Sequence, residues 1–113
     1  VIGGRWASEF QMTPVPLAAT LGRTGHGGRT GFDGSAYAIA GESGVGDDSG
    51  HVIAAHVAWS GESRWCIDTL GTGARQLQIG AAFRPGEIRL KPGARFETPP
   101  AYAVLSACGW NGV

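Results

Sequence analysis

The chain contains few charged residues, and those it has cancel. Charged residues make up 16% of its 113 residues, below the ~25% that is usual in globular domains. Nine basic residues balance nine acidic ones, so the formal net charge is zero. Without a positive field, neither nucleic acid nor an anionic membrane has an electrostatic reason to bind. We expect neither as a partner.

Cysteines and long apolar runs are also scarce. Cys66 and Cys108 are the only cysteines and form no C-x-x-C spacing, which excludes zinc ribbons and thioredoxin-like redox sites. A disulfide stays open, but two buried free thiols in a cytoplasmic protein are the expected state. No apolar run approaches the ~20 residues of a membrane span, and no signal-peptide pattern is visible. The chain begins with Val1 rather than Met, as a fragment would.

Helical periodicity is missing, whereas glycine is abundant. No segment keeps apolar residues at positions i, i+3 and i+4 over three turns, so we predict no long helix. The chain has 20 glycines without a period of three, which excludes collagen and favours frequent turns and bulges. Strand patterns at 8–12-residue spacing are typical of a sandwich or barrel. We therefore predict one all-β domain over residues 1–113, an antiparallel β-sandwich of about eight strands.

Residues whose side chains alternate between two faces with a period of two indicate where these strands lie. The clearest runs from His51 to Trp59, and its small or apolar residues on both faces indicate the centre of a sheet. The remaining strands are expected at 5–12, 17–21, 35–40, 64–70, 75–80, 87–90 and 101–107. Hairpin-length connections are expected at 60–63 and 71–73, and Pro85-Gly86 and Pro92-Gly93 have the residue types of type II turns. Residues 41–50 read as a solvated loop with a mobile tip.

No group of residues forms a recognisable catalytic site. The nine carboxylates match no motif, and Asp47-Asp48 is typical of a solvated turn rather than a calcium loop. His51 and His56 have opposite strand parity, so they cannot share one metal ion without a bulge. No G-x-S-x-G sequence is present. We assign no catalytic, metal or cofactor residue, expect no cofactor, and expect this chain alone to be inactive.

One cluster of side chains suits a sugar. Exposed aromatic rings stack on pyranose faces, and polar groups fix the hydroxyls. Trp59, Arg64 and Trp65 surround one expected connection and are the candidate carbohydrate contacts. The alternative is that Trp59 and Trp65 are buried in the core or in an interface.

Several short motifs follow one another along the chain. They are Gly4-Arg5-Trp6-Ala7 with Glu9, Leu21 to His26, Gly50 to Gly61 with its Trp-Ser-Gly, Gln76 to Gly80, Pro85-Gly86-Glu87, Leu90 to Gly93, Phe96 to Pro99, and Cys108 to Gly112. In this order they resemble the C-terminal part of the N-terminal β-sandwich domain of glycoside hydrolase family 36 α-galactosidases. Three departures are the missing Asn-Pro after His26, His51 in place of a common glutamate, and Trp110 in place of leucine.

The resemblance implies a parent enzyme that hydrolyses terminal α-galactosyl residues of raffinose-type oligosaccharides, within carbohydrate metabolism. Retaining enzymes of this kind use two carboxyl groups about 5–5.5 Å apart. In the family both lie in a (β/α)₈ barrel that follows the sandwich, and its nucleophile motif is absent here. The resemblance thus implies a non-catalytic domain that braces the barrel and takes part in a homo-oligomer. The alternative is a stand-alone carbohydrate-binding module with galactosides as ligands.

Overall fold

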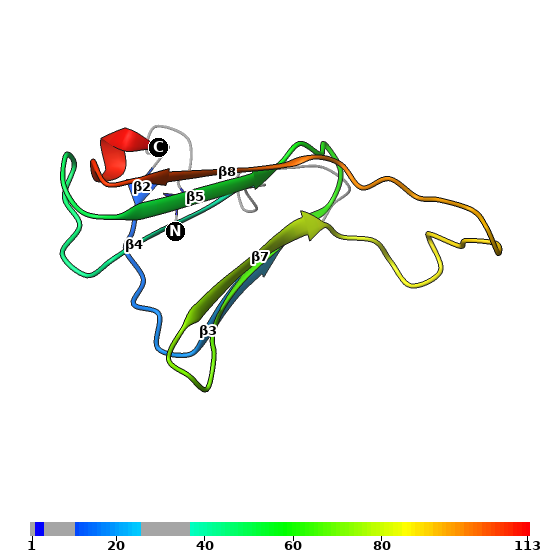
Figure 1. Ribbon diagram of the computed structural model, residues 1–113, viewed down its shortest axis with the longest axis horizontal. Helices are drawn as coiled ribbons and strands as arrows, with labels where there is room; N and C mark the ends of the chain where they lie inside the picture. The colour runs from blue at the N-terminus through cyan, green and yellow to red at the C-terminus, as the bar shows by residue number, and fades with distance from the viewer. Residues whose placement is uncertain (1, 4–10, 26–36) are drawn as a thin grey trace.

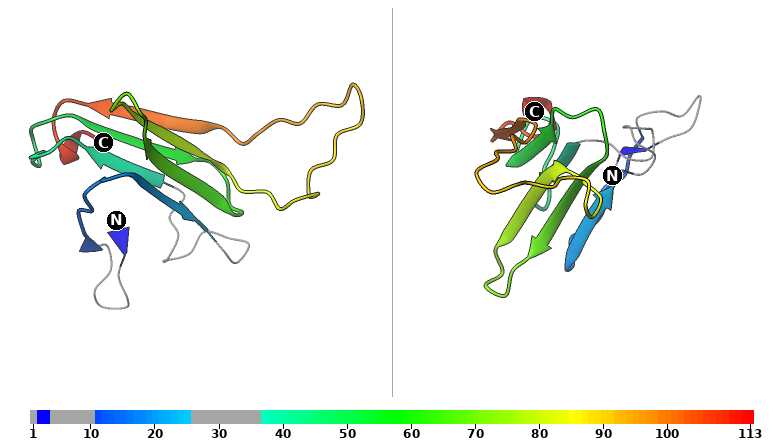
Figure 2. Two further views of the ribbon diagram at one scale, coloured as in Figure 1. Left: turned by 90° about the horizontal axis from the view of Figure 1, so that it is seen from below. Right: turned by 90° about the vertical axis from the view of Figure 1, so that its right-hand side faces the viewer.

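The fold consists of two small antiparallel sheets packed face to face (Figures 1 and 2). The computed structural model describes residues 2–3, 11–25 and 37–113. One sheet has the order β3 (Thr20–Thr24), β6 (Ser63–Thr69), β7 (Arg75–Ala81). The other has the order β4 (Tyr37–Gly41), β5 (Val52–Val57), β8 (Ala101–Ser106). The predicted all-β sandwich is confirmed.

The number of strands differs from the prediction. Six strands form the two sheets rather than about eight, and the two-residue strands β1 (Ile2–Gly3) and β2 (Gln11–Met12) pair only with each other. The predicted strand at 87–90 is wrong, because this segment follows a turn and has no partner strand. The expected strand at 5–12 and the motif around Trp6 lie mostly outside the described residues, as does the stretch after Gly25.

Helix is almost absent from the part of the chain that the structure describes. Its single helical element is the 3₁₀ turn η1 (Trp110–Gly112). Within the same ranges, no helix has the length and apolar character that a membrane crossing requires.

β5 and β6 are the central strands of the two sheets, which agrees with the apolar character of both faces of β5. Both edges of β5 are hydrogen-bonded already, one to β4 and the other to β8, so β6 cannot pair with β5. The expected hairpin at 60–63 is therefore a crossover between sheets. The hairpin at 71–73 is confirmed, since Leu70 N donates to Ala74 O at 2.8 Å and β6 pairs with β7.

The core between the sheets is small. Ala38 of β4 packs against Trp65 and Ile67 of β6. Partly buried side chains surround this cluster: Leu17, Leu21, Ala40, Leu77 and Ile79. With alanines on the β4 side, the core depends on the larger side chains of the other sheet.

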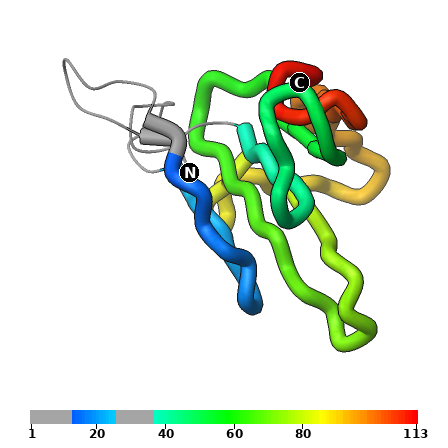
Figure 3. Tube along the Cα trace, turned by 90° about the vertical axis from the view of Figure 1, so that its left-hand side faces the viewer, coloured from blue at the N-terminus to red at the C-terminus, as the bar shows by residue number. Residues whose placement is uncertain are grey.

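The loop 42–50 is fastened to the C-terminal turn (Figure 3). Trp110 N donates to Gly46 O at 3.1 Å, and Asn111 N donates to Asp47 O at 2.8 Å. The Asn111 amide also donates to the Asp48 carboxylate at 2.9 Å. The loop expected to have a mobile tip is thus held by backbone hydrogen bonds, and Asp48 has a structural partner.

Residues 82–100 form a long excursion without strands, which extends beyond the sheets in Figure 1. Both predicted turns are present in it: Glu87 N donates to Arg84 O, and Ala94 N donates to Lys91 O, each at 3.0 Å. Gly86 and Gly93 have φ of 83° and 81°, as position i+2 of a type II turn requires. Aromatic contacts fix the base of the excursion, where Phe83 meets Phe96 edge to face at 5.4 Å.

Candidate functional site

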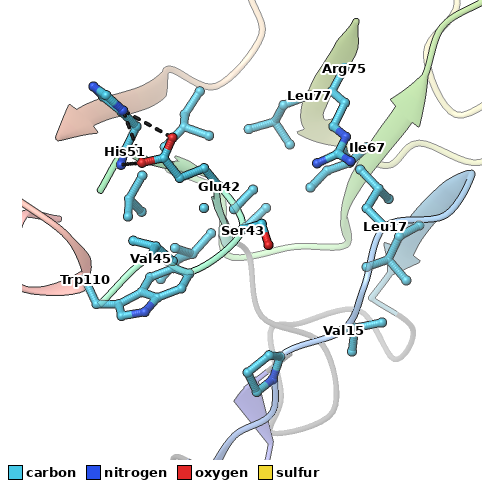
Figure 4. Close-up of a pocket in the computed structure, with 18 of the residues that line it drawn as sticks. Val15, Leu17, Glu42, Ser43, Val45, His51, Ile67, Arg75, Leu77 and Trp110 are labelled. Atoms are coloured by element: carbon cyan, nitrogen blue, oxygen red, sulfur yellow. Dashed lines mark hydrogen bonds and ion pairs between the residues drawn. The ribbon is translucent and has the colours of Figure 1, made fainter. Parts of the chain in front are cut away.

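An open groove lies between the two sheets (Figure 4). Its volume is about 1250 Å³. Leu17, Ile67 and Leu77 line one side, while Val45 and Trp110 line the opposite side. The lining is mainly apolar because the strands that face the groove present their core side chains to it. The residues that the structure describes therefore close the sandwich only in part.

Trp65 contributes a hydrogen-bond donor that nothing in the described chain satisfies. Its side chain is 92% buried at the groove wall, since only 8% of its surface is exposed. The indole Nε1 is buried and has no hydrogen-bond partner among the described residues. Buried donors are normally paired, and an unpaired one costs about 1–3 kcal/mol. The groove thus presents an apolar wall, and the indole donor has no accessible surface on it.

Glu42 and His51 form a polar pair at the rim of the groove (Figure 4). The His51 backbone N–H donates to Glu42 Oε1 at 2.8 Å, and the His51 Nδ1 lies 3.3 Å from both carboxylate oxygens. The backbone N–H, followed by the ring, lowers the pKa of Glu42 below its ordinary value. The pair fastens the start of the loop 42–50 to the start of β5, so its role is structural.

The outer face of the β3–β6–β7 sheet carries a second polar group, centred on Asp68. Its carboxylate accepts from Thr20 Oγ1 at 2.8 Å and from Gln78 Nε2 at 3.2 Å. The Cys66 thiol donates to the same carboxylate at 3.5 Å. Burial, and then Asp68, raises the pKa of Cys66. This raised pKa keeps the thiol protonated and makes it a poor nucleophile.

The two cysteines are both free, as expected, but only one is buried. Cys66 is buried, whereas Cys108 is exposed beside the C-terminal turn. The prediction of a buried Cys108 is wrong, because β8 ends at Ser106 and the Cys108 side chain that follows it is exposed. Among the residues that the structure describes, no three His, Cys, Asp or Glu side chains gather as a metal site would require.

The structure separates the three candidate carbohydrate contacts. Arg64 and Trp65 are neighbours on β6 and point to opposite faces, so Trp65 is buried in the core and Arg64 is exposed outside. Trp59 lies after β5, with 39% of its surface exposed and its ring 6.2 Å from that of Phe83. Sugar binding by these residues stays a prediction, but they cannot form one site together.

Sequence reasoning missed the exposure of β8. Tyr102, Val104 and Leu105 are all exposed, although they lie in a strand with strong apolar character. The sequence carries no signal for this exposure, because the six residues from Ala101 to Ser106 contain no charge and an apolar strand is ordinarily buried. The large apolar side chains exposed in the described ranges are Val15, Trp59, Leu70, Ile88, Leu90, Phe96, Tyr102, Val104, Leu105 and Val113.

Two comparisons with known proteins match most of this chain. Residues 2–91 match the sequence model of the glycosyl hydrolase family 36 N-terminal domain. An Escherichia coli protein named α-galactosidase is 35% identical over 111 residues, which cover 97% of this chain. The chain spans only 16% of the length of that relative. This chain belongs to the glycosyl hydrolase family 36 N-terminal domain family.

Proposed function

We propose that this chain acts as the non-catalytic sandwich of an α-galactosidase, in which it braces a catalytic (β/α)₈ barrel and contributes to subunit assembly. The parent enzyme would release terminal α-galactosyl residues from galacto-oligosaccharides by the retaining route that two carboxyl groups permit. The similarity to a much longer α-galactosidase supports this role, since the matched region is 16% of that protein. Its location in the cytoplasm is part of the same proposal.

The half-closed groove is the observation that carries the bracing role. A mainly apolar wall that is left open has the features of a surface that packs against another folded element. The carboxylates described above instead hold strands and turns together, as Asp68 and Glu42 do. A packing function uses the open apolar wall of the groove, whereas a hydrolytic function would need carboxylates such as Asp68 and Glu42 that already accept hydrogen bonds.

Co-expression tests the bracing role. The Escherichia coli α-galactosidase would be produced without the segment that matches this chain, together with a tagged copy of the chain. We expect the two to co-purify, and the truncated enzyme to become soluble only with its partner. Ile67→Asp, which places a charge in the groove wall, should abolish co-purification, whereas Arg64→Asp on the outer face should not. The proposal would be contradicted by a truncated enzyme that stays soluble and active alone, or by one that does not co-purify with the chain.

One observation favours a second candidate, a carbohydrate-binding module. Trp59 is partly exposed next to Phe83, and the nearby Arg84 Nη2 donates to Glu62 Oε1 at 3.2 Å. An exposed ring beside hydrogen-bonding groups suits a sugar. A thermal-shift panel with galactose, melibiose and raffinose tests it. Binding predicts a rise in melting temperature that Trp59→Ala removes, and no rise with any sugar rejects this candidate.

A further inference from the structure

β8 is an edge strand whose outer side is open. Among the described strands it pairs with β5 alone. Its side chains are exposed on both faces of the sheet, with 55% of Tyr102, 48% of Val104 and 82% of Leu105 accessible. An uncovered apolar edge of this kind is a template for pairing with another strand.

The ladder with β5 determines which backbone groups point outward. Ala58 N donates to Pro100 O at 2.9 Å, which marks residues 58 and 100 as a hydrogen-bonded pair. Hydrogen-bonded and non-bonded pairs alternate along an antiparallel ladder, so Tyr102 and Val104 bond to β5. The N–H and C=O groups of Ala101, Ala103 and Leu105 therefore point away from β5, toward the open edge.

The edges of the other sheet are protected, and that of β8 is not. Arg23 lies on edge strand β3 opposite Trp65, and Arg75 lies on edge strand β7 opposite Thr69. Both arginines thus stand on the inner face of their sheet, and inward-pointing charges are a common device against edge-to-edge pairing. From Ala101 to Ser106, β8 has neither a charge nor a proline.

We propose that β8 pairs with β8 of a second copy of this chain, antiparallel, around a two-fold axis that passes through Ala103 perpendicular to the sheet. Ala103 then exchanges two hydrogen bonds with the partner's Ala103, and Ala101 faces the partner's Leu105. Every outward N–H and C=O of the edge is used in this register. The result is one continuous sheet in the order β4–β5–β8–β8–β5–β4.

The side chains suit a second copy as the occupant. In this register Tyr102 stands opposite the partner's Val104 in a non-hydrogen-bonded pair, where side chains approach most closely. Aromatic and β-branched residues are favourable neighbours across strands. Because the edge has no charge, two copies meet without like-charge repulsion. The inference rests on the assembly role proposed above and specifies its surface.

Sedimentation velocity on the full chain tests this interface. The wild type should be dimeric at high micromolar concentration, and Ala103→Pro should be monomeric. That proline removes an outward N–H and leaves the ladder with β5 intact, as edge strands tolerate. Ala103→Val keeps the N–H and should remain dimeric. If Ala103→Pro fails to fold, Leu105→Lys replaces it as the test, because the lysine places a charge on the edge and should also make the chain monomeric. A monomeric wild type, or a dimeric Leu105→Lys, would overturn the interface.

Cross-linking tests the register. In a Cys108→Ser background, Ala103→Cys should form a disulfide-linked dimer, since facing Cα atoms lie about 5.5 Å apart in such a pair. Ala101→Cys and Leu105→Cys should cross-link only when the two variants are mixed. Cross-linking of either one alone, or none with Ala103→Cys, would contradict the register. Failure here leaves co-purification with the truncated enzyme unaffected, so the two proposals are tested separately.

Discussion

Asp68 shows what single polar residues do in this chain. Its carboxylate joins Thr20 on β3 to Gln78 on β7 across the central strand, so one charge holds three strands in register. Glu42 similarly fixes a loop to the start of β5 through His51. At this scale these two carboxylates are structural. The reaction rate of the thiol beside Asp68 and the pH dependence of the stability that Glu42 contributes can measure their effects.

The two thiols should react at different rates. Burial and the neighbouring Asp68 raise the pKa of Cys66, whereas Cys108 is exposed. Since the thiolate is the reactive form, we expect Ellman's reagent at pH 8 to modify Cys108 at least about tenfold faster than Cys66. The variants Cys66→Ser and Cys108→Ser show which cysteine gives the fast phase of the reaction and which gives the slow phase. Equal rates in the folded protein, or a faster Cys66, would show that the outer face of β6 is open.

Glu42 should stabilise the fold only when it is ionised. Its folded-state pKa is lowered from 4.5, so the stabilisation is fully present above that value and is lost as pH falls through the lowered pKa. Glu42→Gln should therefore reduce the melting temperature at pH 7, and the difference from wild type should disappear in acid. Glu97→Gln serves as the exposed control. A difference that persists unchanged at low pH would contradict a charge-dependent role.

At the scale of elements, the C-terminal turn and the loop 42–50 form one unit. Gly109 lies where the backbones of the two segments meet: it is buried, has φ of 64°, and donates from N to Gly50 O at 3.0 Å. A Cβ on Gly109 would collide with Gly46 O, Asp47 O and Ser49 N. The glycine is needed both for its backbone conformation and for this close approach.

Two glycine substitutions separate these requirements. Gly44→Ala, at φ of 81° with no atom near its new Cβ, should cost only the ~1–2 kcal/mol of a left-handed residue. Gly109→Ala adds the collision and should cost more than about 3 kcal/mol. Chemical denaturation measures both free energies of unfolding. Similar costs at the two positions would mean that the C-terminal turn does not pack on the loop as described.

The strands could largely be predicted from the sequence, but their pairing could not. Alternation located β5 to β8 to within about two residues, because period two is a local property. The sequence predicts a hairpin where the structure has the crossover after β5, since a short connection looks the same whether the next strand joins the same sheet or the opposite one. The expected strand at 87–90 has apolar residues but no neighbour with which to pair.

The candidate sugar site shows the same limit. Trp65 and Arg64 are adjacent in sequence, and strand geometry alone places them on opposite faces. Which face is the core depends on the second sheet, which the sequence of β6 does not reveal. The open edge at β8 could not be predicted either, because an apolar strand without charge is ordinarily buried.

The molecule as a whole exposes more surface than a compact monomer of its mass would. The chain exposes 8332 Å², whereas a compact monomer of its mass exposes about 5,800 Å². Its radius of gyration is 15.9 Å, against about 13 Å for a compact domain of this length. The excess is in part apolar, as Leu105 and Phe96 illustrate. Such a surface fits a domain that functions in contact with others.

The most direct test exchanges the matched segment of the Escherichia coli α-galactosidase for this chain and measures nitrophenol release from nitrophenyl α-galactoside. If the chain is a bracing domain without catalytic groups, the hybrid should hydrolyse the substrate, whereas the chain alone should release nothing above the buffer rate. Ile67→Asp in the hybrid should remove activity together with soluble enzyme. Turnover by the chain alone, or a soluble, folded hybrid that is inactive, would contradict the account.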